Sequence, residues 1–300
     1  MPIEFHDMGN EPPTTKLKLG IFGKEKHGKS WLAATGRKPI LVNDFDNRAE
    51  ALNGKDGVYV ISYVDPQWPN QPDAAQLFLT VLDRLEHSLD LYELRDLFPP
   101  HVRDRIPKET IIRTNVIDSV QTLGQAFQRY ALFGVKDIRR ELTIGKTKVF
   151  LPGGWDAWNA EMISVENTVL RLLALPTDTI IVYHETLEET EDSTSEKPKY
   201  TGKIGVFPVR YQRLIKYLNE LWRVHLTQVI KDGKSTFQPK VYPLPNFEFD
   251  GATAMLLDAQ EEPNITALIA KHEQKLLASG RGPKSLADKP TKLIDLQTRR

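Results

Sequence analysis

The segment that most constrains the fold is KLKLGIFGKEKHGKSWLAATG, residues 16–36. Its first part, LKLGIF, predicts a buried strand, and the residues from Lys29 to Ala34 predict the start of a helix. Between them lies the pattern G-x-x-x-x-G-K-S. A strand, such a loop and a helix, in this order, point backbone N–H groups and a helix N-terminus at a phosphate. A chance match is expected in on the order of one per cent of chains this long, so we predict a working phosphate-binding loop.

The residues of this loop have separate predicted roles. Gly23 and Gly28 permit a strained backbone and a close approach to phosphate. Lys29 is expected to contact the β- and γ-phosphates, and the Ser30 hydroxyl to bind Mg²⁺. The alternative is a glycine-containing turn with a solvated lysine. The full predicted nucleotide-binding set is Gly23, Lys24, Glu25, Lys26, His27, Gly28, Lys29, Ser30 and Trp31.

Two later segments each end a predicted strand with carboxylates. In TNVIDSVQTL, Asp118 stands where a strand gives way to a helix, and Ser119 is the expected local cap of that helix. Beside a phosphate loop, such a residue is predicted to complete a Mg²⁺ shell with Ser30. In LVNDFDN, Asp44 and Asp46 lie two residues apart and therefore face the same side of an extended chain. Asp46 lies further past the strand end and is the predicted water-orienting residue. The structural alternatives are a helix N-cap at Asp118 and two solvated loop carboxylates.

The order of these segments resembles the RecA-like core of P-loop NTPases. A phosphate loop is followed by a strand ending in spaced acids and then by a strand ending in VIDSV. In that family the first of these strands ends in Asp-x-Glu, and the Glu activates water. This chain has Asp44-Phe45-Asp46, so the shorter Asp46 would take that role. Val116–Ser119 match the family's V-[IV]-D-S segment. The resemblance implies ATP and Mg²⁺ as cofactors and an ATPase activity.

Within that superfamily the chain resembles the short RecA-like ATPases of bacteriophages, AAA-family ATP-binding proteins linked to recombination and single-strand annealing. The likeness covers about residues 16–250. Their next core strand ends in a His-Glu pair, as IIVYHE does here, which implies that His184 senses the γ-phosphate. A helix-capping or partly buried histidine is the alternative. FQPKVYPLP corresponds to their basic strand, where Lys240 would reach a neighbouring subunit's nucleotide, unless it is a solvated lysine. The implied catalytic set is Lys29, Asp46 and His184, acting in a homo-oligomer.

Predicted strands alternate with predicted helices through residue 185, which indicates an α/β fold with a mainly parallel, doubly wound sheet. LWRVHLTQVI and STFQPKVYPL predict a late β-hairpin that extends the sheet as an antiparallel edge. The expected organisation is a flexible N-terminal arm (1–15), one RecA-like ATPase domain (16–260), a C-terminal helix (261–278) and a basic flexible tail (279–300).

Two long segments after later strands are candidates for contacts with single-stranded DNA. Both are read as loops. KDIRRELTIGKTKVFLPGGW combines cations with aromatic residues, as single-strand grooves do. The second half of TLEETEDSTSEKPKYTGK is basic. A solvated surface excursion is the alternative for both loops. The candidate DNA contacts are Lys146, Lys148, Phe150, Lys199 and Lys203.

Overall charge and composition narrow the possible functions. Lys+Arg and Asp+Glu both number 40, so any nucleic-acid surface must be local. Cysteine is absent, which excludes disulfides and thiolate chemistry. No apolar run is long enough to span a bilayer, and we expect a cytosolic protein, in the host cytoplasm if phage-encoded. The predicted function is a Mg²⁺-dependent ATPase acting on single-stranded DNA, alongside phage replication or recombination proteins. The alternatives are a nucleotide-switched, helicase-loader-like assembly factor and a small-molecule kinase.

Overall fold

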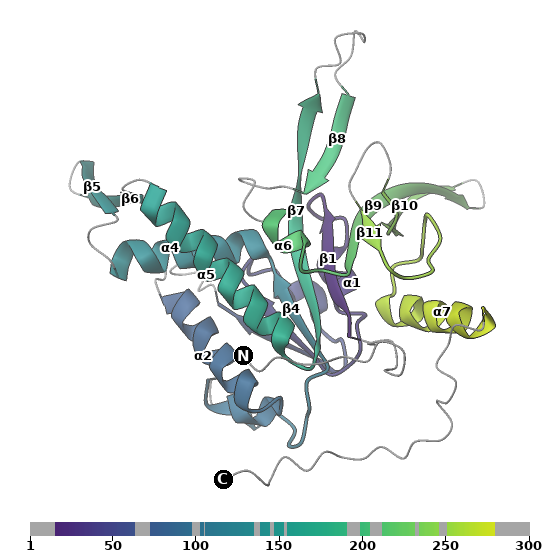
Figure 1. Ribbon diagram of the computed structural model, residues 1–300, viewed down its shortest axis with the longest axis horizontal. Coiled ribbons are helices and arrows are strands. Elements are labelled where there is room, and N and C mark those ends of the chain that lie inside the picture. Colours follow the sequence, from purple (N-terminus) through teal and green to yellow (C-terminus); the bar gives the residue numbers. More distant parts are fainter. Residues whose placement is uncertain are drawn as a thin grey trace.

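The computed structural model gives the arrangement of the elements shown in Figure 1. The segments that the structure describes are 16–63, 73–97, 103–104, 106–134, 139–144, 147–152, 155–190, 199–204, 212–231, 234–245 and 251–279. The predicted N-terminal arm and almost all of the predicted C-terminal tail lie outside the described residues.

A central sheet organises the described part of the chain, with its main strands in the order β10-β9-β1-β7-β4-β2-β3. Every neighbouring pair from β9 to β3 is parallel, and β10 runs antiparallel to β9. The predicted mainly parallel sheet with a late antiparallel hairpin is therefore confirmed. The hairpin joins the sheet through β9, which is parallel to β1. The bounds are β1 (Lys18–Gly23), β2 (Ile40–Asp44), β3 (Val58–Ser62), β4 (Thr114–Asp118), β7 (Asp178–Thr190), β9 (Glu220–Lys231) and β10 (Lys234–Tyr242).

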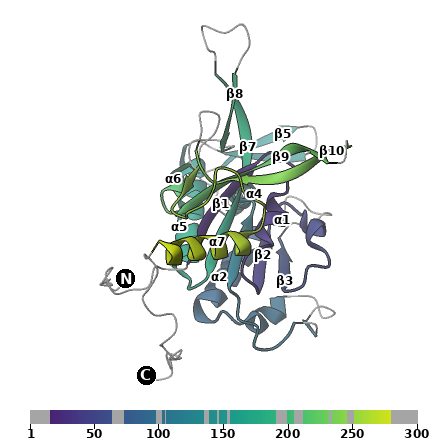
Figure 2. The same cartoon turned by 90° about the vertical axis from the view of Figure 1, so that its right-hand side faces the viewer.

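Helices cover both faces of this sheet, as Figures 1 and 2 show from two directions. On one face lie α2 (Asp73–His87), α4 (Val120–Gly134) and α5 (Trp155–Ala174). On the other face lie α1 (Lys29–Ala33) and α7 (Ile265–Ala278), whose N-cap Asn264 accepts a hydrogen bond from the Ala267 amide at 3.0 Å. The shorter helices are α6 (Gln212–Ile215) and the 3-10 turns η1 (Ala49–Leu52) and η2 (Leu91–Leu97).

The central strands are apolar on both faces because each face packs under helices. In β7, Ile180 and Val182 belong to the core on the α1–α7 side, whereas Ile181 and Tyr183 belong to the core on the α2–α4–α5 side. All four side chains are fully buried. This two-sided burial explains why the segment reads as a continuous apolar run in the sequence.

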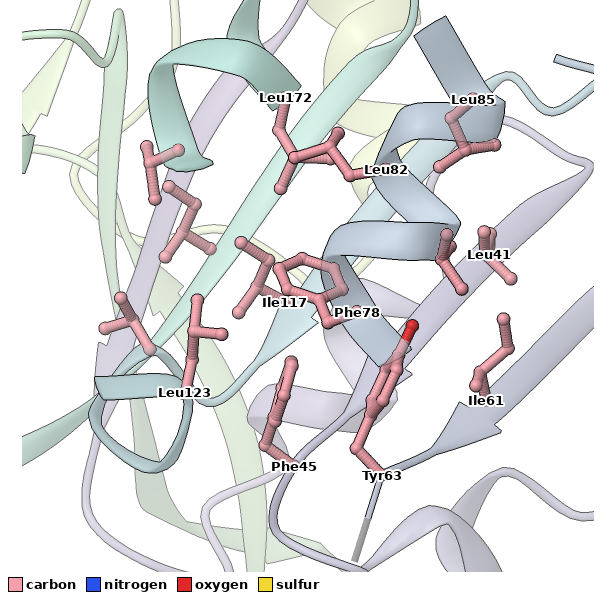
Figure 3. Packing of buried hydrophobic residues seen from close by; sticks show 14 of the residues in the cluster. Leu41, Phe45, Ile61, Tyr63, Phe78, Leu82, Leu85, Ile117, Leu123 and Leu172 are labelled. Atoms are coloured by element: carbon pink, nitrogen blue, oxygen red, sulfur yellow. The ribbon is translucent and has the colours of Figure 1, made fainter. Parts of the chain in front are cut away.

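An aromatic cluster holds the chain just beyond the end of β2 (Figure 3). The Phe45 ring stacks on Tyr63 with centroids 4.6 Å apart, and the Phe78 ring of α2 meets both edge-on at 5.1 and 5.4 Å. Phe45 lies between the two spaced acids of the sequence pattern. Its burial therefore fixes the backbone from which Asp44 and Asp46 project.

Parts of the two segments predicted as loops form strands. β5 (Arg139–Ile144) and β6 (Thr147–Pro152) pair as an antiparallel hairpin, and β8 (Lys199–Ile204) pairs with the far end of β7. A short strand, β11 (Ala252–Thr253), pairs with β9. The loop prediction was wrong for these residues because it gave more weight to charge content than to the strand-like alternation of residues. Antiparallel pairing satisfies the backbone N–H and C=O groups of these segments.

Candidate active site

The predicted site residues meet where the carboxyl ends of β1, β2 and β4 lie beside the middle of β7, the longer strand between β1 and β4. The register pairs Gly23 of β1 with His184 of β7, and Asp44 of β2 with Asp118 of β4. In open α/β sheets, ligands bind outside the carboxyl ends of the strands. Parallel pairing therefore gathers segments that are far apart in the chain at a position suited to a ligand.

The phosphate loop has a backbone that its glycines make possible. Gly28 caps α1 with φ of 94°, in the left-handed region. Gly23 has φ of 155°, and a Cβ there would lie 2.3 Å from the carbonyl oxygen of Val224 in β9. Lys26 also has a positive φ, 61°. Alanine at Gly23 would collide with backbone that cannot move independently, so this position requires glycine.

Lys29 is buried at the first position of α1, with 7% of its surface exposed. Its ammonium donates hydrogen bonds to the Gly23 carbonyl at 2.7 Å and the Lys24 carbonyl at 2.8 Å. Burial lowers the pKa of Lys29, and the nearby carboxylates of Asp118 and Asp46 oppose that change. Backbone carbonyls of the phosphate loop therefore hold the Lys29 ammonium in place. The sequence pattern predicts phosphate contact at this position.

Ser30 and Asp118 join the phosphate loop to the end of β4. The Ser30 hydroxyl donates to Asp118 Oδ2 at 2.5 Å. The Asp118 residue is 7% exposed, and burial, together with the charges of Asp46 and Asp44, raises its pKa to about 6. A hydroxyl and a carboxylate oxygen side by side are hard oxygen donors of the kind that Mg²⁺ prefers.

The donor set fits Mg²⁺ bound together with a nucleotide. Among the residues that the structure describes, no group of three or more His, Cys, Asp or Glu side chains forms a metal cage. Mg²⁺ is usually bound through one or two carboxylates plus the phosphates of a substrate, so it does not require such a cage. Ser30 and Asp118 are the residues that would hold it.

We expect Asp118→Asn to stabilise the metal-free protein at high pH. Because the folded pKa of about 6 lies above the ordinary value of 3.8, the carboxyl favours the folded state while protonated. That contribution disappears as pH rises from about 4 through about 6. The melting temperature of Asp118→Asn should therefore exceed that of the wild type at pH 8 in Mg²⁺-free buffer, with the difference shrinking at pH 5. An equal difference at both pH values would contradict the raised pKa.

Asp46 is held by three side chains, from the start of α4 and the middle of β7. Ser119 donates to its Oδ1 at 3.0 Å, and Thr122 donates to the same oxygen. His184 Nε2 lies 3.0 Å from Asp46 Oδ2 and 3.0 Å from the Ser119 hydroxyl. Burial by itself would raise the pKa of Asp46, but hydrogen bonds from His184 and Thr122 outweigh it and lower the pKa to about 2. Asp46 is therefore an ionised, fixed acceptor at neutral pH.

Asp44, the other spaced acid, closes a turn. Its carboxylate accepts hydrogen bonds from the backbone amides of Asp46 at 3.0 Å and Ala49 at 3.2 Å, and from the Ser62 hydroxyl at 3.1 Å. The residue is 2% exposed. Its carboxylate therefore serves its own turn and β3, whereas that of Asp46 faces Ser119, Thr122 and His184 at the site.

The middle of β7 connects this network to α4 and β9. The Gln121 side chain of α4 accepts a hydrogen bond from the backbone amide of His184 at 3.2 Å. The following residue, Glu185, pairs with Arg223 of β9 through contacts of 2.6 and 3.2 Å. The Glu185 side chain is fully buried and that of Arg223 is 9% exposed. This ion pair connects the strands on either side of β1 directly beyond the point where the phosphate loop begins.

Three other predicted nucleotide-binding residues, His27, Glu25 and Trp31, contact side chains outside the loop. His27 packs edge-on against His225 of β9 at 5.1 Å, and burial followed by the charge of His225 lowers the pKa of His27. Glu25 lies 3.7 Å from Arg48. The Trp31 residue is 41% exposed, and the Lys55 ammonium lies 4.4 Å from its ring centre.

The remaining predicted residues belong to β6, β8 and β10 or lie outside the described residues. Lys240 pairs with Glu262 of the same chain and its side chain is 12% exposed, so reaching a neighbouring subunit would require that pair to break. Lys148 and Phe150 belong to β6, and Lys199 and Lys203 to β8. Lys146 lies outside the described residues.

Several functional contacts were missed by the sequence analysis. Thr122 and Gln121 had no predicted role, and Ser119 was predicted only as a local helix cap. The spacing of Ser119 and Thr122, three residues apart at a helix start, places them on one face and is the signal that was available. The Glu185–Arg223 pair had no local signal, because its partners are 38 residues apart.

A family model described as AAA domain matches residues 15–240. This match spans more than half of the chain, and the chain belongs to the AAA domain family. It is therefore a nucleotide-binding domain of the P-loop ATPase type, as the sequence analysis predicted. No curated protein matches the chain. Among the described residues, no helix is long and apolar enough to cross a membrane.

Proposed function

We propose that this AAA domain is a Mg²⁺-dependent ATPase that acts on single-stranded DNA in phage-type recombination or replication, as a homo-oligomer. The observation that carries the ATPase part is the 2.5 Å contact between Ser30 and Asp118, which are 88 residues apart in the chain. The fold brings the phosphate loop and a buried carboxylate together at the sheet edge where ligands bind. The action on DNA is supported by the resemblance to phage ATPases.

The roles of the site residues follow from their positions. Lys29 and the loop amides would bind phosphates, and Ser30 and Asp118 would hold Mg²⁺. Bound Mg²⁺ supplies positive charge that neutralises phosphate oxygens. Asp46 would accept a hydrogen bond from the attacking water and orient it. With a pKa of about 2, Asp46 is too weak a base to remove a proton efficiently at neutral pH, so its role is orientation.

His184 would transmit the state of the site to β9. It contacts Asp46 and Ser119 at 3.0 Å through one ring nitrogen. Its neighbour Glu185 is bound to Arg223. A shift of Asp46 on nucleotide binding would therefore change the contacts of β7 and β9, the two strands that flank β1.

The proposed function is tested by measuring Mg²⁺-dependent ATP hydrolysis with and without single-stranded DNA. We expect turnover to require Mg²⁺ and to rise when DNA is added. ATP turnover that does not respond to DNA would overturn the DNA part of the proposal. Absence of ATP binding would overturn all of it.

A second candidate function is a nucleotide-switched assembly factor that binds a protein partner. The observation that favours it is an exposed apolar pair on the β9–β10 hairpin, Ile230 at 73% and Phe237 at 67% exposure. Phe237 pairs with Gln228, and Gln228 donates to the Ser235 side chain at 2.7 Å, so these residues share one face of the hairpin. ATP binding without a DNA response would favour this function.

A further inference from the structure

A basic trough lies at the edge of the sheet opposite the phosphate loop. Two adjoining hollows, of about 690 and 570 Å³, share Arg37 and Arg113 in their lining. The first is also lined by Lys38 and Lys55, and the second by Lys16. These five cations are called the basic trough below.

The fold places these cations together in a simple way. Lys16, Lys38 and Arg113 each stand one or two residues before a parallel strand begins, at β1, β2 and β4. Amino ends of parallel strands share one edge of the sheet, so the three side chains gather there. Arg37 precedes Lys38, and Lys55 comes from the turn before β3. None of the five cations stands at the carboxyl end of a strand, so the trough is separate from the candidate active site.

The charge in the trough is strongly unbalanced. Among its lining residues there are five cations and one acid, Asp178. That acid is already engaged: Arg37 donates to its two oxygens at 2.6 and 2.7 Å, and the Leu17 amide donates at 2.8 Å. Glu273 of α7 adds a weaker charge effect on Arg37. Within the described part of the chain, Lys38, Lys55 and Arg113 form no ion pair with a carboxylate, and Lys38 and Arg113 are exposed.

An exposed aromatic ring borders these cations. The Lys55 ammonium lies 4.4 Å from the ring centre of Trp31, whose residue is 41% exposed. Grooves for single-stranded nucleic acids combine cations that follow the backbone with aromatic rings on which bases stack. Two hollows joined through shared arginines suit an extended chain of phosphates better than a single small anion.

We infer that the basic trough binds the phosphate backbone of a single-stranded nucleic acid, at the sheet edge opposite the ATP site. This inference rests on the proposed function and assigns its DNA contact to residues outside the segments that the sequence predicted. The trough cations lie at the opposite end of the parallel strands from the phosphate loop, so the phosphates of DNA and those of ATP would bind to different surfaces.

The test compares Lys38→Gln/Arg113→Gln with a matched variant, Arg213→Gln/Lys216→Gln, whose cations are exposed near α6. Glutamine keeps most of each side-chain stem, and both variants lose the same charge. Binding of a fluorescent oligothymidylate is measured by anisotropy across a series of salt concentrations. ATP binding, measured with a fluorescent ATP analogue, reports that each variant is folded.

For the trough variant we expect affinity for the oligonucleotide to fall by about ten- to a hundredfold. The slope of log K against log salt should decrease by about two, one for each phosphate that the variant no longer neutralises. ATP binding should be unchanged, and the matched variant should bind DNA like the wild type.

The outcomes separate this inference from the function on which it rests. DNA binding by the wild type that the trough variant retains would overturn the inference and leave the proposed function standing. An equal loss of affinity in both variants would also overturn it, because the effect would then be one of net charge. Displacement of the oligonucleotide by tripolyphosphate at constant ionic strength would assign the trough to small phosphates instead. A wild-type protein that binds no DNA would overturn the proposed function itself.

Discussion

Replacing Lys29 by alanine is expected to reduce ATP turnover by about 10²- to 10³-fold and to weaken ATP binding. The ammonium of this side chain is buried and fixed by two carbonyls of the phosphate loop. A preorganised cation of this kind stabilises negative charge without the cost of rearranging solvent. Steady-state hydrolysis and binding of a fluorescent ATP analogue measure the two effects.

Lys29→Met distinguishes loss of charge from loss of packing, because methionine retains the length of the buried stem. Both variants should lose activity to a similar extent and keep a wild-type-like melting temperature. Lys216→Met is the matched control, since this lysine is exposed and its contacts are a surface ion pair with Glu166 and the ring of Tyr217, 4.6 Å away. Full activity in Lys29→Met would contradict the assignment of Lys29 to phosphate.

Replacing Asp46 by asparagine is expected to reduce turnover by about 10²- to 10⁴-fold while leaving ATP affinity nearly unchanged. Asparagine preserves the shape and one acceptor oxygen for Ser119 and Thr122, but it removes the charge that orients water. Single-turnover hydrolysis and ATP binding, measured side by side, separate the two effects. Glu50→Gln, a change at an exposed acid of η1, is the control.

The same substitution should also lower stability at neutral pH. The folded pKa of Asp46, about 2, lies below the ordinary value of 3.8, so its ionised form favours folding. This contribution amounts to about 2 kcal/mol. It is present above pH 4 and fades as pH falls toward 2. Urea unfolding at pH 7 measures it, and a variant with wild-type stability and wild-type turnover would contradict both roles.

The order of elements and the phosphate loop could be predicted because their signals are local. Continuous apolar runs mark strands covered on both faces, and helical spacing marks α2, α5 and α7. The loop pattern lies within eight consecutive residues, from Gly23 to Ser30, and its conformation depends mainly on those residues. Asp118 was recognisable because the break from strand to helix is itself a local signal.

The roles of the two spaced acids could not be separated with certainty from the sequence. Both follow the same strand, and both are aspartates. The structure shows that Asp44 closes its own turn, whereas Asp46 faces Ser119, Thr122 and His184. The burial of Phe45 between them is what directs the two carboxylates to different surroundings.

The sequence by itself determined the alternating strands and helices, the phosphate loop and the metal-binding pair of residue types, since these depend on neighbours along the chain. Only the tertiary structure decided which strands lie next to β1. The insertion of β7 between β1 and β4, and of β9 on the other side, brings His184 to Asp46 and Arg223 to Glu185. It also gathers the basic trough at the opposite edge. Strand order is set by packing of the whole sheet, so contacts between distant segments carry no local signal.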